Sequence, residues 1–163
     1  MRTLVVYYSM EGNTAYAADR IAKALGADTL RLRPKKEFPS KGALKFVWGG
    51  KSALMAEAPE LVATDVDVDA YERIVLGTPV WASTFAPPLR TFLKGHDIAG
   101  KRVAAFVCQA GSGGEKALAR LRQCAGVSAF EAEAILIDPL ERPSQDTEDK
   151  ISTFCSTLLA SKG

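Results

Sequence analysis

A group of small polar residues near the N-terminus has the composition of a phosphate-binding turn. Ser9, Asn13 and Thr14 carry hydroxyl or amide donors, and Gly12 allows the backbone to approach a ligand closely. The group follows an apolar run and precedes a helical pattern, and a helix N-terminus directs free N–H groups and a positive dipole end at one point. We therefore predict phosphate binding by residues 9–14. The alternative is an ordinary capped helix, because Ser, Asn and Thr are frequent N-cap residues.

This first loop differs from the two best-known nucleotide motifs. It contains no Lys or Arg, whereas the Gly-rich Walker loop ends in Lys followed by Ser or Thr. It also lacks the three-glycine spacing of the dinucleotide fingerprint. Any phosphate bound here would be held by neutral donors.

Two later segments could contact a flat aromatic ligand. The second loop, residues 77–88, carries Trp81, which could stack on a ring or, alternatively, pack in the core. The third loop, residues 109–114, is rich in glycine and leaves backbone N–H and C=O groups reachable. These groups, and the side chain of Gln109, could hydrogen-bond the polar edge of a heterocycle. The alternative for the third loop is a flexible connector.

Short β-rich runs alternate with helical patterns along the chain, which is typical of βαβ units and a parallel sheet. We predict strands at residues 3–8, 28–32, 73–76, 102–108 and 132–137. We predict helices at 14–25, 87–95, 115–125 and near the C-terminus, where Ile151, Phe154, Leu158 and Leu159 form an inward face. Residues 33–62 are less regular, with short helical patterns at 43–48 and 52–56.

These elements predict a single α/β domain spanning residues 1–163, with a doubly wound, five-stranded parallel sheet covered by helices on both faces. With the strand order 2-1-3-4-5, the ligand crevice opens at the carboxyl ends of strands 1 and 3. The three loops follow strands 1, 3 and 4, so we expect them to lie at this edge.

The same three loops resemble those of the flavodoxin family, in the correct order and over nearly the whole chain. The matching segments are YYSMEGNT, GTPVWASTFAPPLRTFL and CQAGSGG. The similarity is closest to short flavodoxin-like proteins that carry a tract like FVWGGKSAL, residues 46–54, before the third strand. The resemblance implies a three-layer flavodoxin-like fold and noncovalent FMN.

The resemblance also implies which residues bind this cofactor. The phosphate would lie on the first loop and the isoalloxazine ring between the second and third loops. The implied cofactor-binding residues are Ser9, Met10, Glu11, Gly12, Asn13, Thr14, Thr78, Pro79, Val80, Trp81, Ala82, Gln109, Ala110, Gly111, Ser112 and Gly113. No catalytic side chain is expected, because the flavin itself would perform the chemistry.

Two departures from the flavodoxin pattern affect this assignment. Glu11 stands where the family has a phosphate-binding threonine, so we expect its side chain to point outward while its N–H serves the ligand. The third loop lacks the tyrosine that covers the outer flavin face in typical electron carriers, and it has no acidic residue before Glu115. That face is therefore open, or is covered by Trp48.

The functional expectation is an FMN-binding redox protein that transfers electrons to or from a partner protein. The alternative is an FMN-dependent NAD(P)H oxidoreductase that reduces quinones or similar small acceptors. A pI near 8.4 and the uncovered third loop favour this enzyme, whereas the absence of a second nucleotide motif opposes it. A receiver-type signalling domain is excluded, because no acidic cluster follows strand 1 and no Asp directly follows strand 3.

Composition restricts the partners and the compartment. A net charge of +2 does not require a nucleic acid, and no apolar run approaches the roughly 20 residues that span a membrane. The N-terminal residues predict a strand rather than a secretion signal, and three widely spaced cysteines suit a reducing compartment. We expect a cytoplasmic protein. No metal site is predicted, since the single histidine, His96, lies in a polar turn where it should be solvated.

Overall fold

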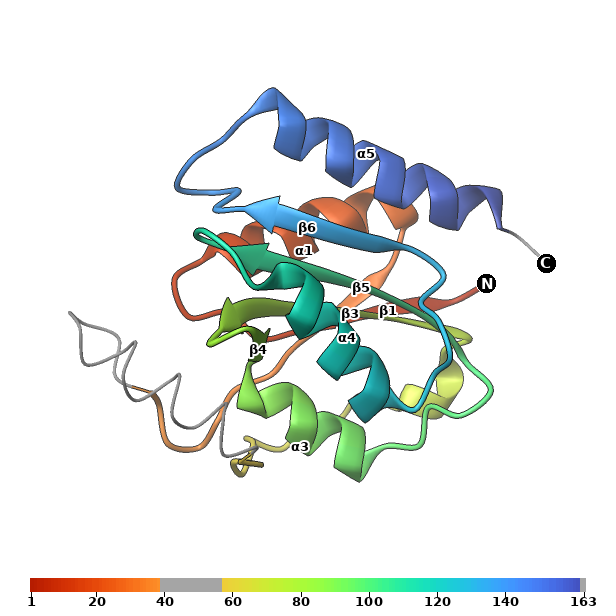
Figure 1. Cartoon of the computed structure of the whole chain (residues 1–163). Coiled ribbons are helices and arrows are strands. Elements are labelled where there is room, and N and C mark those ends of the chain that lie inside the picture. Colours follow the sequence, from red (N-terminus) through yellow and green to blue (C-terminus); the bar gives the residue numbers. More distant parts are fainter. Residues whose placement is uncertain (39–56, 162–163) are drawn as a thin grey trace.

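A parallel sheet with helices on both faces forms the centre of the protein in the computed structural model, which describes residues 1–38 and 57–161 (Figure 1). The parallel strands follow the order β2-β1-β3-β5-β6. Their bounds are Thr3–Tyr7 for β1, Asp28–Arg31 for β2, Arg73–Trp81 for β3, Arg102–Gln109 for β5 and Glu133–Ile137 for β6. A short strand β4 (Thr84–Phe85) pairs antiparallel with β3. The predicted fold class and strand order are confirmed.

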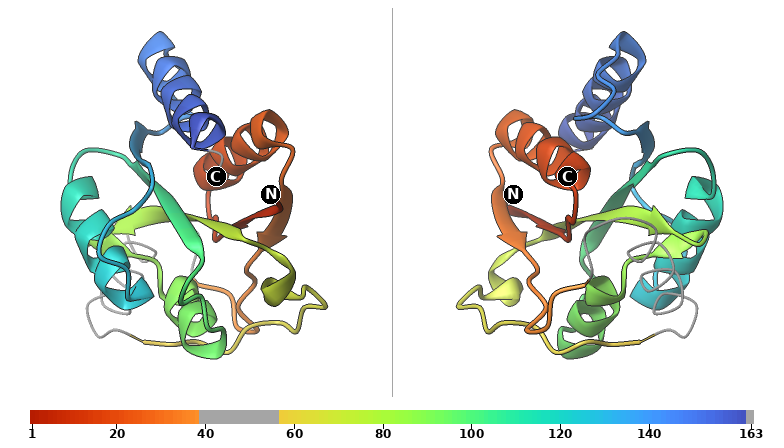
Figure 2. Two further views of the ribbon diagram at one scale, coloured as in Figure 1. Left: turned by 90° about the vertical axis from the view of Figure 1, so that its right-hand side faces the viewer. Right: turned by 90° about the vertical axis from the view of Figure 1, so that its left-hand side faces the viewer.

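Described helices cover both faces of the sheet, as both views in Figure 2 show. The helices α1 (Asn13–Leu25) and α5 (Gln145–Ala160) lie on one face. The helices α3 (Pro87–Gly95) and α4 (Gly114–Ala125) lie on the other, with the short 3-10 helix η1 (Val68–Ala70) before β3. The protein therefore has three layers, as predicted.

Alternating residues of the central strands fill two separate cores. In β1, Leu4 and Val6 face the core beneath α3 and α4, whereas Val5 faces the core beneath α1 and α5. In β3, Ile74 faces the core beneath α3 and α4, and Val75 faces the core beneath α1 and α5. Successive side chains of a strand point to opposite faces, so a strand covered on both sides is apolar throughout. This explains the nearly continuous apolar runs in the sequence.

The third strand is longer than predicted, and its end differs from the expected loop. The prediction placed residues 77–81 in a loop, but β3 continues to Trp81 and turns back through a two-residue turn into β4. Ala82 and Ser83 both have positive φ angles, 50° and 59°. Such turns usually carry Asn-Gly, so the sequence contains no signal for this hairpin.

A cluster of charged side chains joins the sheet to the end of α5. The Arg73 side chain is 5% exposed and donates from Nε to Glu131 Oε2 at 2.9 Å. Arg102 also pairs with Glu131, and Ser161 Oγ donates to its Oε1 at 2.6 Å. Arg73 further donates to the carbonyl of Leu158 at 2.9 Å. This buried cluster connects β3, β5 and the C-terminal helix.

A lysine of helix α5 contacts the backbone of the edge strand β6. Lys150 Nζ donates to the carbonyl of Ile135 at 3.2 Å and also pairs with Asp146 at 3.2 Å. On α5, Ile151, Phe154 and Leu158 are buried as predicted, but Leu159 is 43% exposed and Cys155 takes its place inside.

The segments on either side of residues 39–56 form a short antiparallel ribbon beside β2. Lys35 N–H donates to the carbonyl of Glu60 at 2.9 Å, and Val62 N–H donates to that of Arg33 at 2.7 Å. Phe38 is buried. The helical patterns predicted at 43–48 and 52–56, the FVWGGKSAL tract and Trp48 lie outside the described residues. Among the described helices, none is long and apolar enough to cross a membrane.

Candidate functional site

The first loop joins β1 to α1 and is held by its own serine. Ser9 Oγ accepts hydrogen bonds from the N–H groups of Gly12 at 3.2 Å and Ala15 at 3.1 Å. Gly12 precedes α1 with a φ angle of 102°, a conformation that L side chains rarely adopt. Since both acceptor positions of the Ser9 hydroxyl are used, its hydrogen remains to donate to a ligand.

The first turn of α1 presents free donors at this loop. Ala15 N–H is bound by Ser9, and Tyr16 N–H donates to the carbonyl of Gly12 at 2.9 Å. Helix geometry leaves the N–H groups of Asn13 and Thr14 without an intrahelical acceptor. These donors and the helix dipole have the geometry that an anion site requires, and phosphate binding at this loop stays a prediction.

The side chain of Asn13 contacts a segment that the sequence analysis did not include. Its Oδ1 accepts hydrogen bonds from the N–H groups of Leu140 at 2.9 Å and Glu141 at 3.2 Å. This use of Oδ1 leaves the Nδ2 group of Asn13 as a donor. The loop after β6, residues 138–142, therefore lies against the first loop.

One cavity of about 180 Å³ brings all three predicted loops together. Its walls include Ser9, Met10, Glu11, Asn13 and Thr14 of the first loop, Pro79, Val80 and Trp81 of β3, and Ala110 of the third loop. Glu11 is exposed and also lines the cavity, and the outward orientation of its carboxylate stays a prediction. Three further lining residues, Cys108, Asp138 and Glu141, were not predicted.

Parallel topology contains a signal for two of these missed residues. Asp138 and Glu141 follow the fifth predicted strand, and the carboxyl ends of all parallel strands meet at one edge of the sheet. Cys108 lies at the end of β5 and is buried. Burial raises the pKa of its thiol to about 12, although a hydrogen bond with Thr14 opposes the shift. Cys108 is thus a neutral thiol beside the first loop.

Trp81 both lines the cavity and packs against aromatic residues. Its ring lies edge-on to Tyr8, with centroids 5.7 Å apart, and to Phe38, with centroids 5.4 Å apart. Burial raises the pKa of the Tyr8 phenol well above its ordinary range, with the Glu37 charge adding to this effect and Arg31 opposing it. Trp81 therefore packs against the aromatic residues of the core and also lines the cavity, and its contact with a ligand stays a prediction.

The side chain of Gln109, which was expected to bind a ligand, stabilises the third loop. Gln109 Oε1 accepts from Gly114 N–H at 2.9 Å, and its Nε2 donates to the carbonyl of Gly111 at 3.2 Å. The Gln109 amide is therefore engaged within the loop. Ala110, Gly111 and Ser112 are exposed, but the carbonyls of Ala110 and Gly111 already accept hydrogen bonds from Arg142 and Gln109.

The other predicted residues surround the cavity without lining it. Thr78 is fully buried, and its hydroxyl donates to the carbonyl of Pro79 at 2.8 Å and accepts from Ala86 N–H at 2.9 Å. Ala82 forms the hairpin turn, and Gly12 shapes the first loop. Gln109, Gly111, Ser112 and Gly113 line a neighbouring hollow of about 450 Å³, together with Ser83.

The shared cavity is smaller than the roughly 300–1,000 Å³ that small-molecule sites enclose. The hollow beside the third loop is a separate space that shares no lining residue with this cavity. The cavity combines donors of the first loop with the Trp81 ring, and the side chains of Glu11, Asp138 and Glu141 also line it. This arrangement fits a ligand with a phosphate group and a flat ring.

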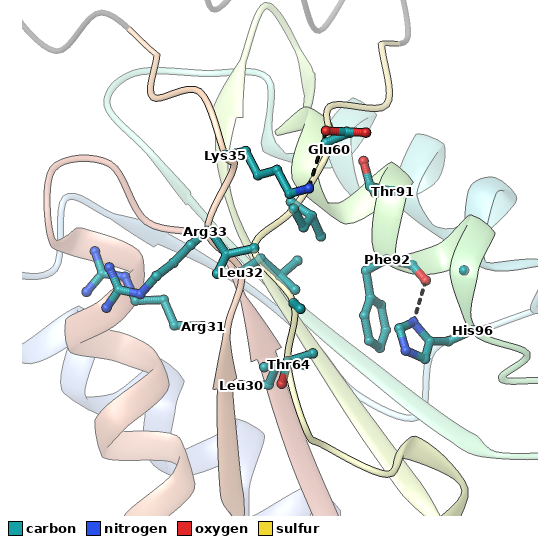
Figure 3. Close-up of a pocket in the computed structure, with 14 residues that line it drawn as sticks. Leu30, Arg31, Leu32, Arg33, Lys35, Glu60, Thr64, Thr91, Phe92 and His96 are labelled. Carbon is teal, nitrogen blue, oxygen red and sulfur yellow. Dashed lines mark hydrogen bonds and ion pairs between the residues drawn. The ribbon is translucent and has the colours of Figure 1, made fainter.

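A larger cavity of about 650 Å³ lies elsewhere, between β2, residues 60–64 and α3 (Figure 3). Several of its polar groups are already engaged: Lys35 pairs with Glu60 at 3.5 Å, and Thr91 Oγ1 donates to the carbonyl of Pro59 at 2.6 Å. His96 Nδ1 donates to the carbonyl of Phe92 at 3.0 Å, and its ring stacks on Phe92. His96 is therefore packed rather than solvated, and this cavity contains none of the predicted loop residues.

Comparisons with known proteins identify a family from the sequence and a similar fold among solved structures. A family model described as flavodoxin matches residues 2–146. A Bacteroides eggerthii protein assigned as a flavoprotein has 22% sequence identity, a TM-score of 0.75 and 99% coverage of both chains. A Lactobacillus acidophilus flavoprotein solved in complex with FMN has 22% identity and a TM-score of 0.69, over 93% of this chain and 98% of that one. Oxidised flavodoxin 1 from Bacillus cereus has 17% identity, a TM-score of 0.57 and full coverage of both chains.

Proposed function

Because the chain belongs to the flavodoxin family, we propose that it is an FMN-binding redox protein that transfers electrons to and from a partner protein. One observation carries the proposal: three loops that are distant in sequence meet at a single cavity, which is lined both by donors at a helix N-terminus and by a tryptophan. The FMN complex of the similar Lactobacillus acidophilus protein supports the choice of cofactor.

The described residues fit the two ends of FMN. The N–H groups of Asn13 and Thr14, Asn13 Nδ2 and the Ser9 hydroxyl would hold the phosphate, and Trp81 and the backbone near Ala110 would hold the ring. Bound FMN would supply the redox chemistry, which explains why no catalytic side chain is needed. The protein's own groups then bind, orient and desolvate the cofactor.

The binding test compares FMN with riboflavin, which lacks the phosphate group. We expect about one FMN per chain and a much weaker riboflavin complex. Asn13→Asp should weaken FMN binding roughly 5- to 100-fold, because it removes the Nδ2 donor and adds a negative charge beside the phosphate, a loss of about 1–3 kcal/mol. Oδ1 would still accept from Leu140 and Glu141, so the loop contact is retained.

Flavin fluorescence titration of the purified apoprotein measures these affinities. Gln123→Glu, which makes the same charge change at an exposed position of α4, is the matched control and should bind FMN normally. Riboflavin affinity should be nearly the same in Asn13→Asp and in the unaltered protein. Equal affinities for FMN and riboflavin in the unaltered protein would refute the assigned phosphate site.

Trp81 should be the principal tryptophan that contacts the flavin. Trp81→Ala is expected to increase the fluorescence of bound FMN and weaken its binding, because an aromatic contact that quenches the ring is lost. Trp81→Phe retains the edge-on packing with Tyr8 and Phe38 and should have a smaller effect. Trp48→Ala is the comparison. Recovery of fluorescence in that variant alone would assign the contact to Trp48 instead.

An FMN-dependent NAD(P)H oxidoreductase that reduces quinones or similar acceptors is the second candidate. The exposure of Ala110, Gly111 and Ser112 favours it, because a hydride donor or acceptor could approach the flavin from that side. NAD(P)H oxidation by the FMN-loaded protein, with a soluble quinone and no other protein, separates the two functions. An electron carrier should show negligible turnover, and rapid turnover would support the enzyme.

We propose a cytoplasmic location and a redox protein as the partner of the carrier. The cysteines Cys108, Cys124 and Cys155 form no disulfide bonds, which suits a reducing compartment. Co-purification with a reductase that reduces the bound FMN would identify this partner.

A further inference from the structure

The loop after β6 contacts both the phosphate end and the ring end of the candidate site. Residues 138–142 connect β6 to the segment before α5, and none of them was part of the predicted site. Two sets of hydrogen bonds attach this loop, one to the first loop and one to the third. The bonds to the first loop span 127 and 128 residues of the sequence, and the bond from Arg142 to Ala110 spans 32.

Arg142 forms the attachment to the third loop. One of its terminal nitrogens donates to the carbonyl of Ala110 at 2.6 Å, and its Nε donates to Asp138 Oδ2 at 3.0 Å. The Arg142 N–H donates to the carbonyl of Asp138 at 2.7 Å, which closes a tight turn. Asp138 adopts a φ angle of 37°, and its N–H donates to the carbonyl of Gln109 at 3.1 Å. The turn between Asp138 and Arg142 therefore orients the Arg142 guanidinium.

Asn13 and Gly12 form the attachment to the first loop. Asn13 Oδ1 accepts from two consecutive N–H groups, those of Leu140 and Glu141. The Leu140 side chain lies over Gly12, where a Cβ atom would be 3.0 Å from Leu140 Cδ2. A change in the orientation of Asn13 would therefore move the backbone on which Arg142 is carried.

We propose that residues 138–142 form a latch that couples phosphate binding at the first loop to the position of the third loop. This inference rests on the proposed FMN site. A phosphate bound by Asn13 Nδ2 fixes the amide, the fixed Oδ1 orders the N–H groups of residues 140 and 141, and the ordered turn holds Arg142 against Ala110. Arg142 is a positioning residue, because it acts on the flavin through the third loop.

The coupling can be measured with inorganic phosphate and riboflavin as separate probes of the two ends. In the unaltered protein, saturating phosphate should tighten riboflavin binding at least about 5-fold, the lower range for coupled sites. By reciprocity, riboflavin should tighten phosphate binding by the same factor. Sodium chloride at equal ionic strength serves as the reference, so a general salt effect is removed.

Arg142→Met removes every donor of the guanidinium while keeping an unbranched side chain. We expect phosphate to change riboflavin affinity less than about 2-fold in this variant, whereas Arg33→Met, which removes the same charge from an exposed ribbon residue, should retain full coupling. Arg142→Lys should restore part of the coupling, because one donor can still reach Ala110.

Circular dichroism and the unfolding temperature verify that each variant is folded. If Arg142→Met does not fold, Asp138→Asn, which loosens the same turn, replaces it.

Each outcome of this experiment decides the proposal. Unchanged coupling in a folded Arg142→Met protein, or the absence of coupling in an unaltered protein that binds FMN, would overturn the latch and leave the FMN site intact. An unaltered protein that binds neither FMN nor riboflavin would overturn the proposed function together with the latch. Loss of coupling with the phosphate and riboflavin sites both still functional would support it.

Discussion

Replacing Glu131 by alanine should lower the free energy of unfolding by about 3–5 kcal/mol, since removal of one partner leaves a buried charge without compensation. Arg73 is the charge concerned, because its side chain is 5% exposed and donates to Glu131 from two nitrogens, at 2.9 and 3.2 Å. Arg102, at 30% exposure, is better hydrated and should contribute less. The remaining bonds of Arg73 to backbone carbonyls cannot neutralise its charge.

The loss should also depend on pH. Burial by itself raises the pKa of the Glu131 carboxyl, but hydrogen bonds from Ser161 and Arg73 and the charges of Arg73 and Arg102 outweigh it and lower the pKa. A carboxyl with a lowered pKa in the folded state stabilises the protein above its unfolded pKa, and this stabilisation disappears as the pH falls through the folded value. The difference between the unaltered protein and Glu131→Ala should therefore be greatest near neutral pH and decrease in acid.

Urea unfolding at neutral pH and at several acidic pH values tests this prediction. Glu133→Ala is the control, because Glu133 is exposed on the neighbouring strand and its loss should change stability by less than about 0.5 kcal/mol. A loss below about 1 kcal/mol in Glu131→Ala would show that Arg73 finds other compensation.

Replacing Gly77 by alanine should destabilise the protein by about 3 kcal/mol, at the upper end of the range for overpacked cores. A Cβ atom at this position would lie 2.3, 2.7 and 2.9 Å from three ring atoms of Phe106, the residue paired with Gly77 on β5. The Phe106 ring is fully buried and packs edge-on against Phe154, so it has little room to move. We also expect weaker FMN binding, because Gly77 precedes the part of β3 that carries Trp81.

A second substitution shows whether the ring causes the effect. Phe106→Leu should recover a substantial part of the stability of Gly77→Ala, because it removes the atoms that clash. Gly95→Ala is the control, since a Cβ atom there would meet no atom within 4 Å. Its unfolding temperature should match that of the unaltered protein or exceed it slightly. If Gly77→Ala is as stable as Gly95→Ala, the Phe106 ring leaves enough space for a Cβ atom at position 77.

Gly77 also explains why the sequence prediction ended the third strand too early. Gly-Thr-Pro is a typical turn signal, yet the glycine provides space for Phe106 and the proline lies at the carboxyl end of β3, paired with Cys108. The hairpin that follows uses Ala82 and Ser83 at positive φ, residue types that do not indicate a turn of this kind. Tertiary packing, rather than local preference, determines both features.

The first loop and the strand order could be predicted because local patterns and topology act together there. A strand, a polar turn and an amphipathic helix placed Ser9, Asn13 and Thr14 at the carboxyl edge, where the structure has them. The contribution of residues 138–142 could not be predicted in the same way. It depends on the partner of a single Asn13 oxygen, and Asp138 and Arg142 form no motif of their own.

The contact between Lys150 and the carbonyl of Ile135 has a consequence for the behaviour of the protein at high concentration. A strand at the margin of a sheet exposes backbone groups that can recruit a strand from another molecule and begin aggregation. Lys150 occupies one of these groups on β6 with a charged, hydrated side chain, and Asp146 holds it there. Helix α5 therefore covers part of the exposed edge of β6, in addition to covering the core, and Lys150→Ala should make the protein more prone to aggregate at high concentration.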